Sequence, residues 1–151
     1  MKKELMSWEE CSGHLRQVFI DLEKAKSLLK LCRVRVRVLL SVKLDEETAS
    51  IIAEDYYEII KELLTALLLL SGRKSDNHEC LIAFFKKNYP QKEYETAVIY
   101  ELKRIRNAID YEGLFVEKSY VERNRLEFKH IIDFLTAEAE EKLKNTEVIT
   151  L

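Results

Sequence analysis

The sequence contains very little glycine and proline, with three glycines and one proline in 151 residues. Turn-rich β architectures need many of these residues, and phosphate-binding loops need several closely spaced glycines, so this composition excludes both. Long apolar runs are absent as well. The longest, residues 63–70, is interrupted by Thr65 and is far shorter than the roughly 20 residues that cross a bilayer. We therefore expect no membrane-spanning segment.

Cysteine is scarce and neither sign of charge dominates. Cys11, Cys32 and Cys80 are odd in number, widely spaced and without a CxxC pair, so we expect reduced thiols and a cytoplasmic protein. The 25 Lys and Arg residues nearly balance the 27 Asp and Glu residues, which gives a net charge of −2. Any binding of nucleic acid would therefore need a local basic patch rather than an overall basic surface.

The sequence does contain helical periodicity, which is strongest near its start. Ser7 and Glu10 have the spacing of a capping box, and apolar residues then recur in steps of three and four through residues 8–40. Residues 33–38 also alternate Arg and Val as a strand would, and Gly13 weakens the first turns. Because the helical period continues through both, the pattern predicts one long first helix over residues 8–40.

Four further helices are predicted by the same criterion. The second is capped by Asp45 and stops at Ser71-Gly72, and the others cover about residues 76–88, 92–110 and 119–144. The second helix becomes apolar almost all round towards its end, which is typical of the centre of a bundle. The sequence therefore predicts a single all-α domain over residues 1–151, an antiparallel four- to five-helix bundle with a long first helix.

Motifs for metal or covalent chemistry are missing. His14, His78 and His130 fall on different predicted helices, and there is no HxxxH pair, GxSxG elbow, Walker loop or GxGxxG motif. We therefore expect no metal ion and no other cofactor. The aromatic residues at helical spacing favour a core over a base-stacking surface: Tyr56, Phe84, Phe85, Phe128 and Phe134. The basic residues Arg33, Arg35, Arg37 and Lys43 favour an ion-paired surface over an RNA site.

Residues 103–113, KRIRNAIDYEG, form the most informative segment. At 100° per residue, Lys103, Arg106 and Asp110 lie on one flank of the fourth predicted helix, beside its apolar stripe. There the guanidinium of Arg106 would be partly desolvated and could still reach a phosphate. The alternative is an ion pair between Arg106 and Asp110, which are four residues apart.

This segment also carries a resemblance to a known family. RNAIDYEG, together with EDYYEIIKELLTALLLLSGRKSDNHECLIAFF at residues 54–85, resembles the HEPN family (higher eukaryotes and prokaryotes nucleotide-binding domain). The resemblance is closest to the short stand-alone archaeal and bacterial members, and it covers about residues 15–143. It implies an antiparallel bundle of four or five helices, in agreement with the periodicity.

The resemblance also implies a function. Many HEPN proteins are metal-independent endoribonucleases, often toxins paired with a minimal nucleotidyltransferase, and they act as dimers with the cleft at the interface. Their signature is Arg, a polar residue and then His after four to six intervening residues. Carried over, Arg106 and Asn107 take the first two places, but the His places hold Tyr111, Glu112 and Gly113. A tyrosine, with a pKa near 10, is a poor base at neutral pH.

Three hypotheses follow. The first is a homodimeric HEPN module, paired with a nucleotidyltransferase, that binds nucleotide or RNA without the catalytic His. Its binding residues would be Lys103, Arg106, Asp110 and His78. The second is an active ribonuclease toxin with catalytic Arg106, Asn107 and Tyr111. The third is a purely structural bundle that associates through its first helix.

Two other pairs match the family signature literally. Arg123 and His130 share a face of the fifth predicted helix, and could replace Tyr111 in the second hypothesis. Arg73 and His78 have the spacing as well, but fall in a loop and at the start of the third predicted helix. Because Arg and His are common on helices, chance matches of this kind are expected. His78 also has a local interpretation, as a polar residue that packs or caps in the first turn of its helix.

Overall fold

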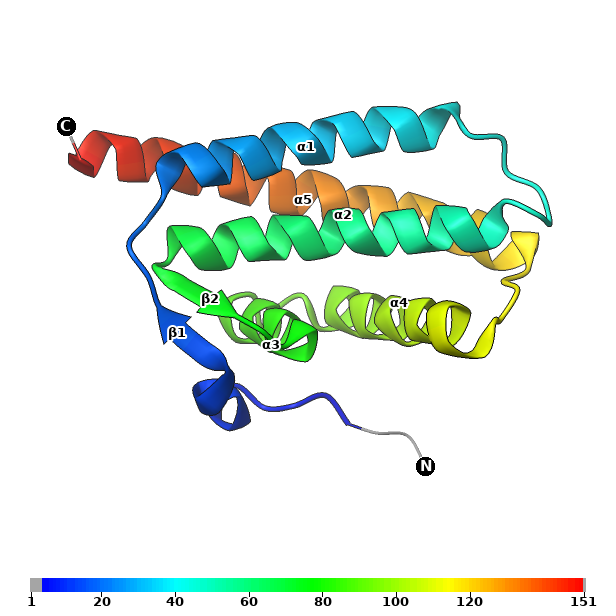
Figure 1. Cartoon of the computed structure of the whole chain (residues 1–151), viewed down its shortest axis with the longest axis horizontal. Coiled ribbons are helices and arrows are strands. Elements are labelled where there is room, and N and C mark those ends of the chain that lie inside the picture. Colours follow the sequence, from blue (N-terminus) through cyan, green and yellow to red (C-terminus); the bar gives the residue numbers. More distant parts are fainter. Residues whose placement is uncertain (1–3, 151) are drawn as a thin grey trace.

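The computed structural model describes residues 4–150 and consists almost entirely of helices (Figure 1). In chain order the elements are the 3-10 helix η1 (Glu9–His14), β1 (Leu15–Gln17), α1 (Leu22–Ser41), α2 (Ala49–Leu70), β2 (Arg73–Ser75), α3 (His78–Asn88), α4 (Glu93–Glu112) and α5 (Lys118–Thr150). The predicted all-α bundle is confirmed. Among the helices described, none combines the length and the apolar character needed to cross a membrane.

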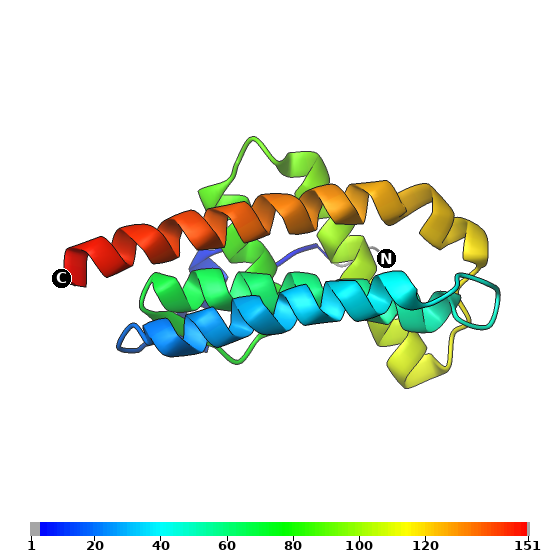
Figure 2. The same cartoon turned by 90° about the horizontal axis from the view of Figure 1, so that it is seen from above.

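Helix α2 forms the centre of the bundle. Of its 22 residues, 15 are buried, so it has almost no solvated face and is covered on several sides. Helix α1 runs antiparallel to α2 on one side, while α5 runs alongside in the same direction as α2 (Figure 1). Helices α3 and α4 pack on the opposite side of α2 from α1 (Figure 1), and α4 crosses the direction of α1, α2 and α5 (Figure 2).

The predicted long first helix is wrong in its first half. Residues 9–14 form only a 3-10 helix, and residues 15–17 form a strand that pairs antiparallel with β2, with Leu15 opposite Ser75. The amide of Val18 continues this pairing by donating to the carbonyl of Gly72 at 2.9 Å. Pairing with a distant segment therefore replaced the local helical pattern. Only one half of the capping box forms: Ser7 Oγ accepts from the amide of Glu10 at 3.2 Å, at the start of η1, whose N-cap residue is Trp8.

The second half of that prediction is correct. Helix α1 begins at Leu22, where the side chain of Asp21 accepts from the amide of Lys24 at 3.0 Å. The alternating residues 33–38 are helical, and Cys32 and Leu39 on the same stripe are buried. The helical period is thus the correct interpretation where a long apolar face is available to pack on α2.

The predicted ends of the other helices agree with the structure to within a few residues, with two exceptions. Helix α2 begins at Ala49 because Asp45 instead closes the preceding turn, its side chain accepting from the amides of Glu47 and Thr48 at 2.9 Å each. Helix α5 continues to Thr150, six residues past the predicted end. The aromatic residues expected in the core are there, as shown by Tyr56 and Phe128, whose ring centroids lie 5.1 Å apart.

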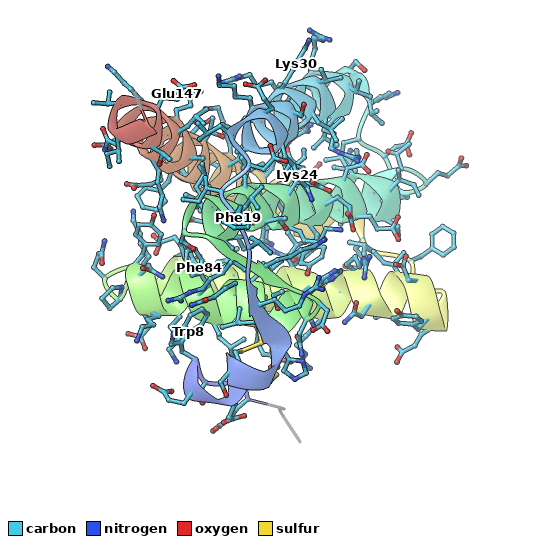
Figure 3. The ribbon with its side chains drawn as sticks, turned by 60° about the vertical axis from the view of Figure 1, so that its left-hand side comes forward. Trp8, Phe19, Lys24, Lys30, Phe84 and Glu147 are labelled. Atoms are coloured by element: carbon cyan, nitrogen blue, oxygen red, sulfur yellow. A yellow bond between two sulfur atoms is a disulfide. The ribbon has the colours of Figure 1, made fainter. Side chains whose placement is uncertain are left out.

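The expectation of three reduced thiols is also wrong. Cys11 and Cys80 form a disulfide, with a Cα–Cα distance of 5.7 Å and no exposed surface on either residue (Figure 3). The two residues are 69 positions apart and have no motif in common. They meet because the β1–β2 ribbon places η1 against α3. Cys32 stays free and buried, and its burial raises its pKa to about 12.

Candidate functional site

An open cleft of about 540 Å³ lies between α4 and the segments that precede α3 and β1. Helix α4 contributes four residues that the sequence had singled out: Lys103, Arg106, Asn107 and Tyr111. They share one side of the helix because they lie three and four residues apart. The opposite wall comes from parts of the chain far away in sequence.

The opposite wall consists of His14, Asp76, Asn77 and His78. The pairing of β1 with β2 places His14 in this wall, because Leu15 lies opposite Ser75 and His14 therefore lies next to Asp76. The Nδ1 atom of His14 lies 3.3 Å from Oδ1 of Asp76. Sequence reasoning missed His14, Asp76 and Asn77 as site residues, since no local pattern signals a contact across 62 positions.

His78 is the first residue of α3 and one of the predicted binding residues. Its neighbour Asn77 caps the helix by accepting from the amide of Glu79 at 2.8 Å, so the capping function expected of His78 belongs to Asn77. Burial lowers the pKa of His78, and the positive charges of Lys61, Arg106 and Lys103 lower it further, while Glu58 opposes them. Three cations thus act on His78 against one anion, so its surroundings favour the neutral imidazole.

Arg106 does not extend freely into the cleft. Its Nη2 lies 3.2 Å from Oε1 of Glu58 on α2, its Nε lies 3.2 Å from Oδ2 of Asp110, and its Nη1 donates to Oδ1 of Asn107 at 3.2 Å. Its Cζ also lies 5.6 Å from the ring centroid of Tyr57. The ion-pair alternative for Arg106 and Asp110 is therefore the one observed. A phosphate at Arg106 would compete with two carboxylates.

Two carboxyl groups that interact with each other, those of Glu54 and Asp110, lie close to Arg106. Burial raises the pKa of Glu54 to about 7, and a hydrogen bond and the charge of Asp110 add to the effect. Near neutral pH, Glu54 is therefore partly protonated and can donate to Asp110. Lys61 Nζ lies 2.7 Å from Glu58 Oε2, so this acidic region is largely neutralised by its own protons and cations. Asp110 is in this network and does not line the cleft.

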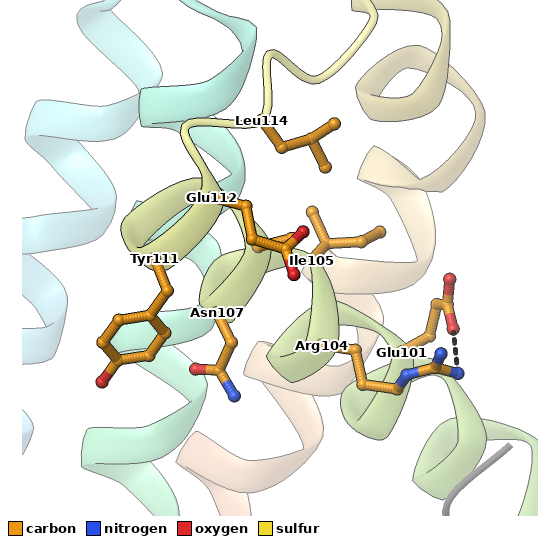
Figure 4. A pocket seen from close by; sticks show the side chains of 8 residues that line it. Glu101, Arg104, Ile105, Asn107, Tyr111, Glu112 and Leu114 are labelled. Atoms are coloured by element: carbon orange, nitrogen blue, oxygen red, sulfur yellow. Dashed lines mark ion pairs between the residues drawn. The ribbon is translucent and has the colours of Figure 1, made fainter. Parts of the chain in front are cut away.

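Tyr111 and Asn107 stand at the outer edge of the cleft and also line a second cavity of about 430 Å³ on the other side of α4 (Figure 4). Tyr111 is 81% exposed. The second cavity contains an ion pair between Arg104 and Glu101, with 3.7 Å between Nη1 and Oε2. The place that the family signature gives to His is therefore held by a solvent-exposed phenol at the rim.

In neither of the two literal matches to the signature do the Arg and the His line the same cavity. His130 lines a separate cavity with Lys92 and Glu127, and Arg123 is not among the residues around it. Arg73 lies over the ring of Trp8, 5.6 Å from its centroid, and does not line the cleft that contains His78. Of the basic surface cluster, Arg33 forms an ion pair with Glu140, as expected of a solvated face.

Comparison of the chain with protein-family models, with curated proteins and with solved structures found no match in any of the three. Within residues 4–150, no group of three or more His, Cys, Asp or Glu side chains is placed to hold a metal ion. The side chains of the cleft are two imidazoles, an ammonium group, two amides, a phenol, the carboxylate of Asp76 and a guanidinium held by the carboxylates of Glu58 and Asp110.

Proposed function

We propose that this chain is a HEPN-type helical module that binds the phosphates of RNA or of a nucleotide in the cleft between α4 and His14 and His78. One observation carries the proposal. Three segments that are far apart in the sequence bring Lys103, Asn107 and the two histidines to the same open cleft. These side chains offer the hydrogen-bond donors and positive charge that phosphate oxygens accept.

Each residue of the cleft would make a different kind of contact with a phosphate. Lys103 supplies a positive charge, Asn107 supplies an amide, and the two imidazoles supply N–H donors from the opposite wall. Arg106 acts as a positioning residue, because its three nitrogens already face Glu58, Asp110 and Asn107. It fixes the side chain of Asn107 and connects α4 to α2, so that the wall carrying Lys103 keeps its place.

A specific observation favours a second candidate function, metal-independent cleavage of RNA. The His missing from the family position is compensated in space by His78 and His14, which enter the same cleft from other elements. His78, with its lowered pKa, would accept the proton of a ribose 2′-hydroxyl, whose oxygen then attacks the phosphorus. His14, paired with Asp76, would give a proton to the departing 5′-oxygen. The products would be a 2′,3′-cyclic phosphate and a free 5′-hydroxyl.

A homodimer and a small nucleotidyltransferase partner belong to the same proposal and depend on the resemblance to HEPN proteins. Apolar surface at the end of α4 supports a partner close to the cleft. Tyr111 is 81% exposed and Phe115 is 74% exposed, and the two flank Gly113 at the end of the helix. Large apolar side chains exposed together mark interaction surfaces more often than isolated ones do.

Binding is tested with a fluorescently labelled single-stranded RNA of 15 to 20 nucleotides, by anisotropy at several salt concentrations. We expect the affinity to fall as salt rises, and Lys103→Gln to weaken binding and reduce the salt slope by about one. Lys129→Gln is the matched control, because Lys129 is exposed on α5 and pairs with Asp133 away from the cleft. Equal binding by the two variants, or no binding by the wild type, would contradict the proposal.

Cleavage is tested with the same RNA in the presence of EDTA. Products that end in a 2′,3′-cyclic phosphate, and that disappear in both His14→Ala and His78→Ala, would establish the second candidate function. His130→Ala is the control, since His130 lines a different cavity. Binding without cleavage would leave the module as a binding protein.

A further inference from the structure

The disulfide lies behind the candidate cleft and joins the two elements, η1 and α3, that form the wall opposite α4. Cys11 is in η1, three residues before His14, and Cys80 is in α3, two residues after His78. The covalent bond therefore holds together the two elements that carry the two imidazoles. Figure 3 shows the bond between the ribbon of the N-terminal segment and the helix behind it.

The N-terminal segment, residues 4–20, is held to the bundle mainly by contacts near the surface. Cys11 is the only buried residue in this segment. The other contacts include the short β1–β2 pairing, the contact of His14 with Asp76 and a hydrogen bond from the amide of Met6 to Glu79 Oε1 at 2.7 Å. The apolar side chains that pack against the bundle are only partly buried: Leu5, Met6, Trp8, Leu15 and Val18. Without the disulfide, only this partial burial and the short pairing would oppose the entropy gained by releasing the segment.

The disulfide lies outside the main core of the bundle. That core is formed by α1, α2, α4 and α5 together with one side of α3, whereas Cys11 and Cys80 belong to a separate small cluster with Ala83. We expect loss of the bond to change the wall of the cleft that η1 and α3 form, and to leave the main core in place.

We infer that the Cys11–Cys80 disulfide is a redox switch for the cleft. In the oxidised protein it holds His14 beside Asp76 and opposite α4, and the cleft binds phosphate. In the reduced protein the N-terminal segment separates from α3, His14 leaves the cleft, and binding weakens. This inference rests on the proposed function, because it concerns the regulation of the same site.

The switching reaction is thiol–disulfide exchange with a cellular dithiol. A thiolate of the dithiol attacks one Sγ and forms a mixed disulfide, and the other Sγ leaves as a thiolate and takes up a proton. The second thiol of the dithiol then displaces the first Sγ, which is protonated in turn. The dithiol loses two electrons and becomes a disulfide, and Cys11 and Cys80 gain them as two thiols. Cys32 is buried in α1 and takes no part.

Ligand and reduction are expected to oppose each other. Both sulfur-bearing residues are fully buried, so exchange requires the N-terminal segment to lift from α3 first. A phosphate ligand that contacts both walls of the cleft holds the segment down. Because coupling between two equilibria is reciprocal, a ligand that binds the oxidised form more tightly must also make reduction less favourable.

The test compares the oxidised protein, the protein in dithiothreitol and the double variant Cys11→Ser/Cys80→Ser. Hydrogen exchange followed by mass spectrometry reports on residues 4–20 and on α2, and anisotropy with the labelled RNA reports on the cleft. We expect faster exchange in residues 4–20 of the reduced protein, unchanged exchange in α2, and binding weaker by about tenfold, a typical coupling between two sites. The double variant should match the reduced protein in both buffers.

The outcomes separate this inference from the proposed function. Equal RNA binding by the oxidised and reduced proteins would overturn the switch and leave the proposed function in place. If no form binds RNA, the proposed function fails, and the exchange of residues 4–20 still decides whether the bond controls the segment. Faster exchange in α2 as well would show a bond needed for folding and would overturn the switch. Slower alkylation of the two thiols when RNA is present during reduction would support it.

Discussion

Arg106 on α4 and Glu58 on α2 form an ion pair, with 3.2 Å between Nη2 and Oε1, on the inner side of the candidate cleft. The side chains are only 20% and 24% exposed, so each needs the other to balance its charge away from bulk water. The pair joins α4, which contributes four residues to the cleft, to the central helix of the bundle. Because its guanidinium is held in this pair, Arg106 supports the wall of the cleft more than it contacts a bound ligand directly.

Replacing Arg106 should destabilise the protein. Arg106→Ala would leave Glu58 and Asp110 without their shared cation, and we expect the free energy of unfolding to fall by about 1–3 kcal/mol. Lys129→Ala removes an exposed i,i+4 pair with Asp133 and should change it by less than about 0.5 kcal/mol. Urea denaturation of both variants measures the difference. Similar values for the two would show that the Arg106 network contributes no more than a surface pair.

The raised pKa of Glu54 should make stability depend on pH. Its pKa of about 7 in the folded protein lies above the ordinary value of 4.5, so between these values the folded protein keeps a proton that the unfolded chain has released. The free energy of unfolding therefore contains a contribution that is complete below pH 4.5 and is lost as the pH rises to about 7. Glu54→Gln should remove this contribution.

The measurement compares wild type and Glu54→Gln at pH 5 and pH 8. We expect the variant to gain stability relative to wild type at pH 8, because the neutral amide cannot repel Asp110. Taking the difference between the two proteins removes the opposite contribution of His78, whose lowered pKa favours the folded state at higher pH. A difference that is the same at both pH values would show that Glu54 does not titrate in this range.

His78 should report on ligand binding through its titration. Its pKa in the free protein should lie below the ordinary value of 6.5, because burial and the charges of Lys61, Arg106 and Lys103 all disfavour the imidazolium ion. An anion in the cleft favours that ion, so pyrophosphate should raise the pKa. NMR titration of the imidazole signals measures both values, and the signals of His130 serve as the control. A pKa of His78 that does not respond to pyrophosphate would place the anion elsewhere.

The glycine that ends α4 should tolerate no side chain without a loss of stability. Gly113 has a φ of +68°, and its amide and that of Leu114 donate to the carbonyls of Ile109 and Ala108. No atom lies within 4 Å of a Cβ built there, so Gly113→Ala should cost about 1 kcal/mol from backbone conformation alone. Gly13→Ala is the control: the site is equally open and its φ is not positive, so no loss is expected. Thermal unfolding of both distinguishes the two effects.

The sequence by itself determined the helices and the centre of the bundle. Contacts between residues three or four apart depend only on helical geometry, so the apolar stripes of α1, α2, α4 and α5 and the pair formed by Arg106 and Asp110 were open to prediction. Gly72 and Gly113 marked helix ends for the same local reason, since both adopt a positive φ that other residues avoid.

Only the tertiary structure decided where the first predicted helix breaks and what the cleft contains. The pairing of β1 with β2, the Cys11–Cys80 bond and the contact of His14 with Asp76 join residues about 60 to 70 positions apart. Their stabilisation comes from the segment that they meet, and it leaves no periodic pattern in either segment alone. Residues 8–20 have the local pattern to continue the helix. Instead, the backbone of residues 15–17 forms its hydrogen bonds with β2, and Cys11 forms a disulfide with Cys80 in α3.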